Sequence, residues 1–122
     1  MLLTNLTILE SGQKHLMGEG KTKGAIIENI FGMFSFFKTN PTFDFASNVM
    51  ANVSSLKDGR RFMVEQNMLK QVLDLVLDRT VTNDHRRKQL LATLRNICFE
   101  YEDYEADFLQ IDLVPKLIKL LV

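Results

Sequence analysis

Apolar residues recur at intervals of three and four along most of the chain, the spacing of helices that bury one face. The predicted helices span residues 1–9, 11–17, 25–37, 43–55, 59–66, 67–77, 84–99, 105–110 and 112–122. Only two prolines and six glycines fall in or between them. The pattern therefore predicts an all-α fold.

Local signals refine several of these helices. Ser11, Asp112 and either Asn83 or Asp84 can cap the helices that follow them. Residues 25–37 are apolar on nearly all sides. We therefore expect that helix to lie between two layers and not at a surface.

Three predicted apolar helices carry an asparagine near their end: Asn5, Asn52 and Asn96. Each is followed by a short polar helix and then a longer apolar one. The asparagines are 47 and 44 residues apart, close to the armadillo/HEAT period of ~40–47 residues. We predict an armadillo/HEAT-type α-solenoid of about two and a half repeats, forming a single domain over residues 1–122. Its units bury their apolar faces by stacking.

On this phasing the chain starts and stops inside a repeat, and neither end carries a polar covering helix. We therefore expect the middle part of a longer solenoid, or ends that associate with those of another copy.

Charge and composition narrow the class of partner. Lys and Arg number 15, as do Asp and Glu, so general binding to nucleic-acid phosphates is not expected. Cys98 is the single cysteine, which excludes an intramolecular disulfide and fits a reducing compartment. The apolar run over residues 24–37 is too short to cross a bilayer. We expect a soluble, cytoplasmic protein with protein partners and no membrane partner.

The predicted partner-binding residues are Asn5, Asn52, Arg86, Arg87, Arg95 and Asn96. A row of asparagine amides on successive helices can hydrogen-bond an extended peptide backbone. Alternatively, each amide bonds the turn that leaves its own helix. The arginines, with Lys88, fall at helical spacing and form either a basic strip for an acidic partner or a solvated face.

Catalytic and cofactor motifs are incomplete. The acidic run over residues 100–107 lacks the turn glycine of a calcium loop, and residues 18–22 (GEGKT) lack the first glycine of a phosphate-binding loop. The phasing places Cys98 far from His15 and His85. We therefore expect no enzyme activity, no metal and no cofactor.

The segments 45–54 (FASNVMANVS), 59–62 (GRRF) and 93–100 (TLRNICFE) resemble the eukaryotic armadillo-like HGH (one) homologue family. The opening LLTNLT resembles its preceding repeat, so the resemblance covers most of the chain. It implies a cytosolic adaptor that helps the chaperonin TRiC fold translation elongation factor 2. The alternative is a generic armadillo-type scaffold, or a structural segment, without a chaperone role.

Overall fold

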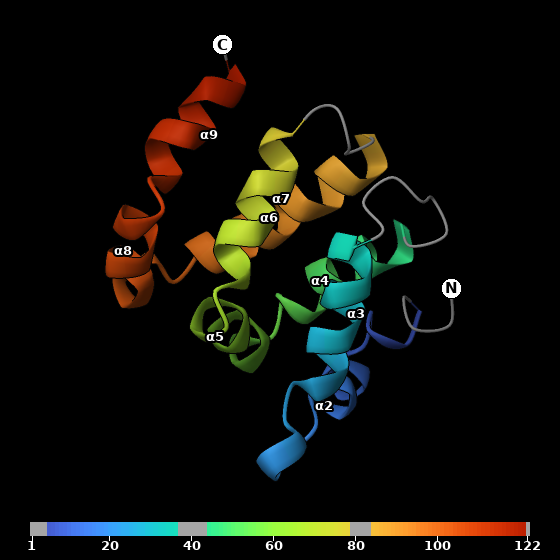
Figure 1. The fold of residues 1–122 in the computed structure, drawn as a ribbon. Coiled ribbons are helices and arrows are strands. Elements are labelled where there is room, and N and C mark those ends of the chain that lie inside the picture. Colours follow the sequence, from blue (N-terminus) through green and yellow to red (C-terminus); the bar gives the residue numbers. More distant parts are fainter. Residues whose placement is uncertain (1–4, 37–43, 79–83, 122) are drawn as a thin grey trace.

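The computed structural model describes residues 5–36, 44–78 and 84–121, and these residues form helices and no strand (Figure 1). The helices are α2 (Glu10–Met17), α3 (Ala25–Phe36), α4 (Asp44–Val53), α5 (Lys57–Glu65), α6 (Met68–Leu77), α7 (Asp84–Cys98), α8 (Tyr101–Gln110) and α9 (Leu113–Leu121), with a 3₁₀ turn, η1 (Gly20–Thr22). The prediction of an all-α fold is confirmed.

The helices fall into three groups in chain order, here called unit 1 (residues 5–36), unit 2 (44–78) and unit 3 (84–121). Figure 1 shows unit 1 (blue to cyan), unit 2 (green to yellow) and helices α8 and α9 of unit 3 (red) side by side, while α7 (orange) crosses behind α6. Helix α4 packs against α7, α3 and α2, and α6 packs against α7, α5 and α9. One apolar core runs through all three units, with Ile27, Leu73 and Ile97 fully buried. The units thus share their interior.

One backbone feature recurs in all three units. The residue before the last helix of each unit has a positive φ: 80° at Gly24, 59° at Asn67 and 54° at Asp112. Glycine, asparagine and aspartate are the residue types that tolerate this left-handed region best. Each such residue turns the chain into the apolar helix that closes its unit.

Side-chain bonds repeat in the same way. Gln13 Nε2 donates to the Thr7 carbonyl oxygen at 2.8 Å, and Arg60 Nη1 donates to the Ser54 carbonyl oxygen at 3.0 Å. Each bond spans six residues, and the two donors stand 47 positions apart. The donor occupies the fourth position of its helix, α2 or α5, and satisfies a carbonyl just before that helix.

Helix α3 differs from the prediction. Ile27, Ile30 and Phe34 are buried against the rest of the protein, but Ile26 is 49% exposed and Phe36 is 81% exposed. The expectation that this helix lies between two layers is wrong for the described residues, because only one of its faces is covered.

Two predicted helix starts are also wrong. Ser11 is not a cap, because α2 begins at Glu10 and Leu9 occupies the cap position with extended backbone. Helix α8 begins at Tyr101, four residues earlier than predicted, and it bends at Tyr104, where φ is −122° and ψ is 17°. Asp112 directly precedes α9 as predicted. Asn83 lies outside the described residues.

Among the helices of the described residues, none combines the length and the apolarity needed to cross a bilayer.

Candidate partner-binding surfaces

Asn52 and Asn96 both reach back to the preceding unit. In α7, Asn96 Nδ2 donates to Ser54 Oγ at 2.9 Å and to the Ala51 carbonyl oxygen at 3.3 Å. In α4, Asn52 Nδ2 donates to Thr7 Oγ1 at 3.1 Å. Ala51 lies in the last turn of α4 and Ser54 directly follows that helix, and Thr7 lies three residues before α2. Both amides therefore tie neighbouring units together and are half-buried.

This arrangement differs from both alternatives for the asparagine row. The bonds from Asn52 Nδ2 and Asn96 Nδ2 go to residues of the preceding unit, an arrangement that neither alternative describes. Asn5, the third member, is exposed, and its carbonyl oxygen accepts a hydrogen bond from the Ile8 N–H at 3.4 Å. Its place in a row of peptide-binding amides stays a prediction.

Arg86 does not belong to an exposed basic strip, and that part of the prediction is wrong. Its side chain is 2% exposed and forms an ion pair with Asp44 at the start of α4. Its guanidinium lies 4.8 Å from the centre of the Phe34 ring, within the range of a cation–π contact. The reason is the helical period. Arg86 lies on the same face of α7 as Leu90 and Ile97, and that face is buried in the core.

Arg87 lies at the edge of the contact between α7 and α6. Its Nε donates to the Val76 carbonyl oxygen at 3.3 Å, and its Nη1 pairs with Asp84 at 3.4 Å. Val76 lies in the last turn of α6, where carbonyl groups lack helical partners and attract cations. Arg87 is thus half-buried and already engaged within the fold.

The remaining cations of α7 define an exposed surface, here called the α7 strip: Lys88, Leu91, Ala92 and Arg95. These residues lie along a shallow depression of 480 Å³ on one face of the helix. Lys88 and Arg95 are exposed, and within the described residues neither forms an ion pair. Leu91 lies between them and is 37% exposed. The strip offers two free cations and an apolar side chain.

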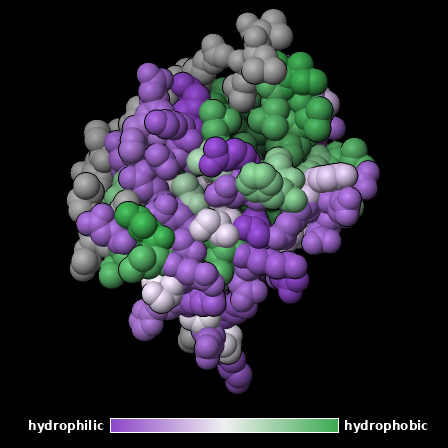
Figure 2. All heavy atoms as spheres, turned by 180° about the vertical axis from the view of Figure 1, so that it is seen from behind, coloured by the Kyte–Doolittle hydropathy of each residue, from purple (hydrophilic) through white to green (hydrophobic). Residues whose placement is uncertain are grey.

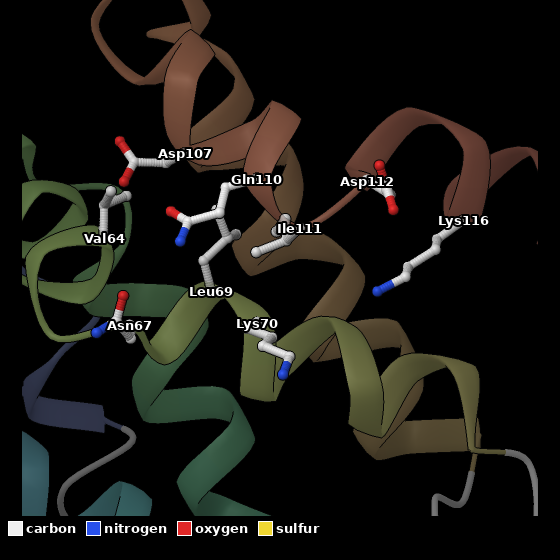
Figure 3. A pocket seen from close by; sticks show the side chains of 9 residues that line it. All are labelled: Val64, Asn67, Leu69, Lys70, Asp107, Gln110, Ile111, Asp112 and Lys116. Atoms are coloured by element: carbon white, nitrogen blue, oxygen red, sulfur yellow. The ribbon is translucent and has the colours of Figure 1, made fainter.

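A second surface lies between units 2 and 3, where nine residues enclose a pocket of 380 Å³ (Figure 3). Its apolar part comes from Val64, Leu69 and Ile111. Its polar part comes from Asn67, Lys70, Asp107, Gln110, Asp112 and Lys116. Figure 3 shows Lys116 reaching from α9 towards α6, which carries Lys70. The two lysines and two aspartates cancel, so the pocket offers donors and acceptors without a net charge.

Comparison with protein families gives one match. A family model described as a domain of unknown function (DUF383) matches residues 1–122. The chain belongs to the DUF383 family. The curated proteins gave no match, and neither did the solved structures. The description of the family assigns no activity, so the function of this DUF383 domain has to be argued from its surfaces.

The reactive groups of the DUF383 domain are few. Cys98 is half-buried, and this burial raises the pKa of its thiol, which disfavours the nucleophilic thiolate. Within the described residues, no three His, Cys, Asp or Glu side chains cluster as metal ligands would. The surfaces that this DUF383 domain displays, the α7 strip and the pocket of Figure 3, present hydrogen-bonding and ionic groups suited to recognition.

Sequence reasoning named the two cations of the α7 strip, Lys88 and Arg95, but not the pocket. Lys88 and Arg95 were visible because both belong to one helix, whose period is known. The pocket joins residues of α5 and α6, such as Val64 and Lys70, to residues of α8 and α9, such as Asp107 and Lys116, which follow them by 43 and 46 positions. No local pattern in the DUF383 sequence brings these together.

Proposed function

We propose that this DUF383 domain is a protein-binding adaptor of the cytoplasm, built as an armadillo-type α-solenoid of about two and a half repeats. Its partners are the chaperonin TRiC and translation elongation factor 2, and it assists the folding of that factor. The contacts that recur between units support the repeat architecture. The resemblance of residues 93–100 to the HGH (one) homologue family supports the choice of partners.

The observation that carries the proposal is the α7 strip. Lys88 and Arg95 are exposed and form no ion pair within the described residues, and Leu91 stands between them. Two cations beside an apolar side chain suit an acidic segment of a protein, because complementary charge speeds encounter and selects partners. The opposite face of α7 is held in the core by Arg86, Leu90 and Ile97. The helix that carries the strip is thus held in place before a partner arrives, so binding does not have to order its backbone.

Recovery of partners from cytosol tests the proposal. The immobilised domain is expected to retain the chaperonin and elongation factor 2, and the double variant Lys88→Glu/Arg95→Glu is expected to lose most of both. A matched control, Lys14→Glu/Lys21→Glu, makes the same charge change on exposed residues of unit 1 and should leave recovery unchanged. Equal recovery with both double variants, or no recovery by the unaltered domain, would contradict the proposal.

One observation favours a second candidate, a scaffold without a chaperone role. Asn52 and Asn96 donate hydrogen bonds from their side-chain amides to the preceding unit. A purely structural repeat would require such bonds. For such a scaffold, the recovered proteins would exclude the chaperonin and elongation factor 2. Recovery would still depend on Lys88 and Arg95.

A further inference from the structure

The two boundaries between units differ at one position. At the first boundary, the buried ring of Phe62 in α5 occupies the space where a Cβ atom on Gly24 would lie. Gly24 is the positive-φ residue of unit 1, and Phe62 stands five positions before Asn67, the positive-φ residue of unit 2. An aromatic ring therefore fills this boundary, in space that is open because glycine has no side chain.

The same position is polar at the second boundary. Asp107 in α8 stands five positions before Asp112, the positive-φ residue of unit 3. It lines the pocket of Figure 3 together with Asn67. Asp107 thus takes the place of Phe62, and Asn67 takes the place of Gly24. The second boundary has no ring at this position, and the pocket of 380 Å³ lies there instead.

The polar lining is not a general feature of unit 3. Val114 and Ile118 of α9 are more than half exposed, and Figure 2 shows a hydrophobic area at the upper right, on the side of the molecule that α9 occupies. Towards α6, in contrast, α9 brings Lys116 into the pocket. The polar groups therefore belong to the boundary between units 2 and 3.

The charges of the pocket lie on two sides. Figure 3 shows the carboxylate of Asp107 and the ammonium groups of Lys70 and Lys116 on opposite sides. Asp112 lies on the lysine side, where two lysines against one aspartate leave a net positive charge. Within the described residues, none of these four side chains forms an ion pair. The pocket thus has a positive and a negative side, and the charges of both are available to a ligand.

Uncharged groups complete the lining. The side-chain amides of Asn67 and Gln110 each offer donors and an acceptor, the two functions that a peptide bond requires. Val64, Leu69 and Ile111 form an apolar part. The volume of 380 Å³ is near the lower end of the range for small-molecule sites, roughly 300–1,000 Å³. The lining therefore matches a small molecule with two opposite charges, an amide and an apolar group.

We propose that the pocket between units 2 and 3 binds a zwitterionic small molecule of the size of a dipeptide. Its carboxylate lies between Lys70 and Lys116, and its ammonium group lies at Asp107. Its amide bonds Asn67 and Gln110, and its side chain covers the apolar part of the pocket. The pocket shares no residue with the α7 strip, so this site does not depend on the proposed function.

Isothermal titration calorimetry with the dipeptide alanyl-leucine tests the site, and we expect saturable binding. Two analogues each lack one charge: N-acetyl-alanyl-leucine has no ammonium group, and alanyl-leucinamide has no carboxylate. Each analogue is expected to bind at least about tenfold more weakly, because it loses a hydrogen bond between charged groups.

Substitutions assign each charge to its side of the pocket. Asp107→Asn is expected to weaken alanyl-leucine about tenfold and to leave the weaker binding of N-acetyl-alanyl-leucine unchanged, because that analogue has no ammonium group to lose a partner. Lys70→Gln/Lys116→Gln is expected to weaken alanyl-leucine to a similar extent and to leave alanyl-leucinamide unchanged. This crossed pattern would not arise from a general loss of structure.

The double variant Asn67→Gly/Asp107→Phe copies the first boundary. Glycine readily adopts the positive φ of residue 67, and the new ring is expected to fill the pocket as Phe62 fills the space at Gly24. We expect this variant to lose binding of alanyl-leucine, while circular dichroism shows that its helices are retained.

Matched controls are Asp103→Asn in α8 and Lys14→Gln/Lys21→Gln in unit 1, because these residues are exposed and do not line the pocket. They should leave binding of all three ligands unchanged. The proposal would be overturned by the absence of saturable binding of alanyl-leucine or by equal binding of the three ligands. Undiminished binding to a folded Asn67→Gly/Asp107→Phe variant would overturn it as well.

Discussion

Gly59 in α5 lies against the carbonyl oxygen of Val53, the last residue of α4. A Cβ atom placed on Gly59 would lie 2.2 Å from that oxygen. Gly12 in α2 stands in the same relation to the Leu6 carbonyl oxygen, at 1.8 Å. Each glycine is the third residue of its helix and faces a residue six positions earlier. The second helix of units 1 and 2 can approach the preceding backbone this closely because glycine has no side chain.

We expect Gly59→Ala to lower the free energy of unfolding by about 1–3 kcal/mol, the usual cost of forcing extra volume into a packed contact. Urea denaturation followed by circular dichroism measures it. Gly32→Ala is the matched control, because a Cβ atom placed on Gly32 would have no atom within 4 Å and the residue is exposed in α3. That change should stabilise by about 0.5–1 kcal/mol through helix propensity. Equal effects of the two substitutions would contradict the close approach.

Arg86→Ala should be among the most destabilising single changes in the domain. It leaves the partly buried Asp44 carboxylate without its arginine and removes the cation above Phe34. Removing one partner of a buried ion pair costs about 3–5 kcal/mol. Arg95→Ala, on the exposed face of the same helix, should stay within about 0.5 kcal/mol of the unaltered protein. If the two variants had the same midpoint in urea, the structural role of Arg86 would be disproved.

Sequence patterns predicted the helices well where one apolar face decides the structure. The helix predicted over residues 67–77 is α6 (Met68–Leu77), and the one predicted over 25–37 is α3 (Ala25–Phe36). The start of α8 was missed because Tyr101, Glu102 and Asp103 show no apolar periodicity. Acidic residues in a first turn nevertheless favour a helix through its dipole. The start of a helix is therefore harder to predict from sequence where its first residues are polar than where an apolar face runs through the helix.

The role of Arg86 shows what a local pattern omits. Its spacing from Leu90 and Ile97 placed it on the buried face of the helix, whereas its charge favoured a position in solvent. The partner that resolves the conflict, Asp44, lies 42 residues earlier. A buried charge is tolerated where an opposite charge meets it, and contact between distant residues is not encoded in one helix. The pocket of Figure 3 was missed for the same reason.

Asn96→Ala should lower the free energy of unfolding by about 1–2 kcal/mol, because Ser54 Oγ and the Ala51 carbonyl oxygen lose a shared donor. Denaturation by urea gives the value. Asn29→Ala removes an exposed asparagine from α3 and should change stability by no more than about 0.5 kcal/mol. An Asn96→Ala variant that kept full stability but lost its protein partners would instead assign this amide to partner binding.

The Arg60–Glu100 pair should make stability depend on pH. Arg60 Nε donates to Glu100 Oε1 at 3.2 Å, and Nη2 donates to the same oxygen. This hydrogen bond, aided by the charge of Arg60, lowers the pKa of Glu100 in the folded state. The unfolded carboxyl titrates near its ordinary value of about 4.3. The pair therefore stabilises the fold above that pH, and its contribution is lost as pH falls through the lower folded pKa.

Urea midpoints measured from pH 7 to pH 3 test this dependence. The unaltered domain should lose more stability below about pH 4.3 than Glu100→Gln, which keeps the shape of the side chain but has no charge to lose. Glu10→Gln is the control: Lys14 also lowers the pKa of Glu10, but both side chains are exposed, and solvent screens such a pair. Its curve should follow that of the unaltered domain. If the Glu100→Gln curve also ran parallel to it at every pH, the Glu100 carboxylate would contribute nothing through its charge to the contact between units 2 and 3.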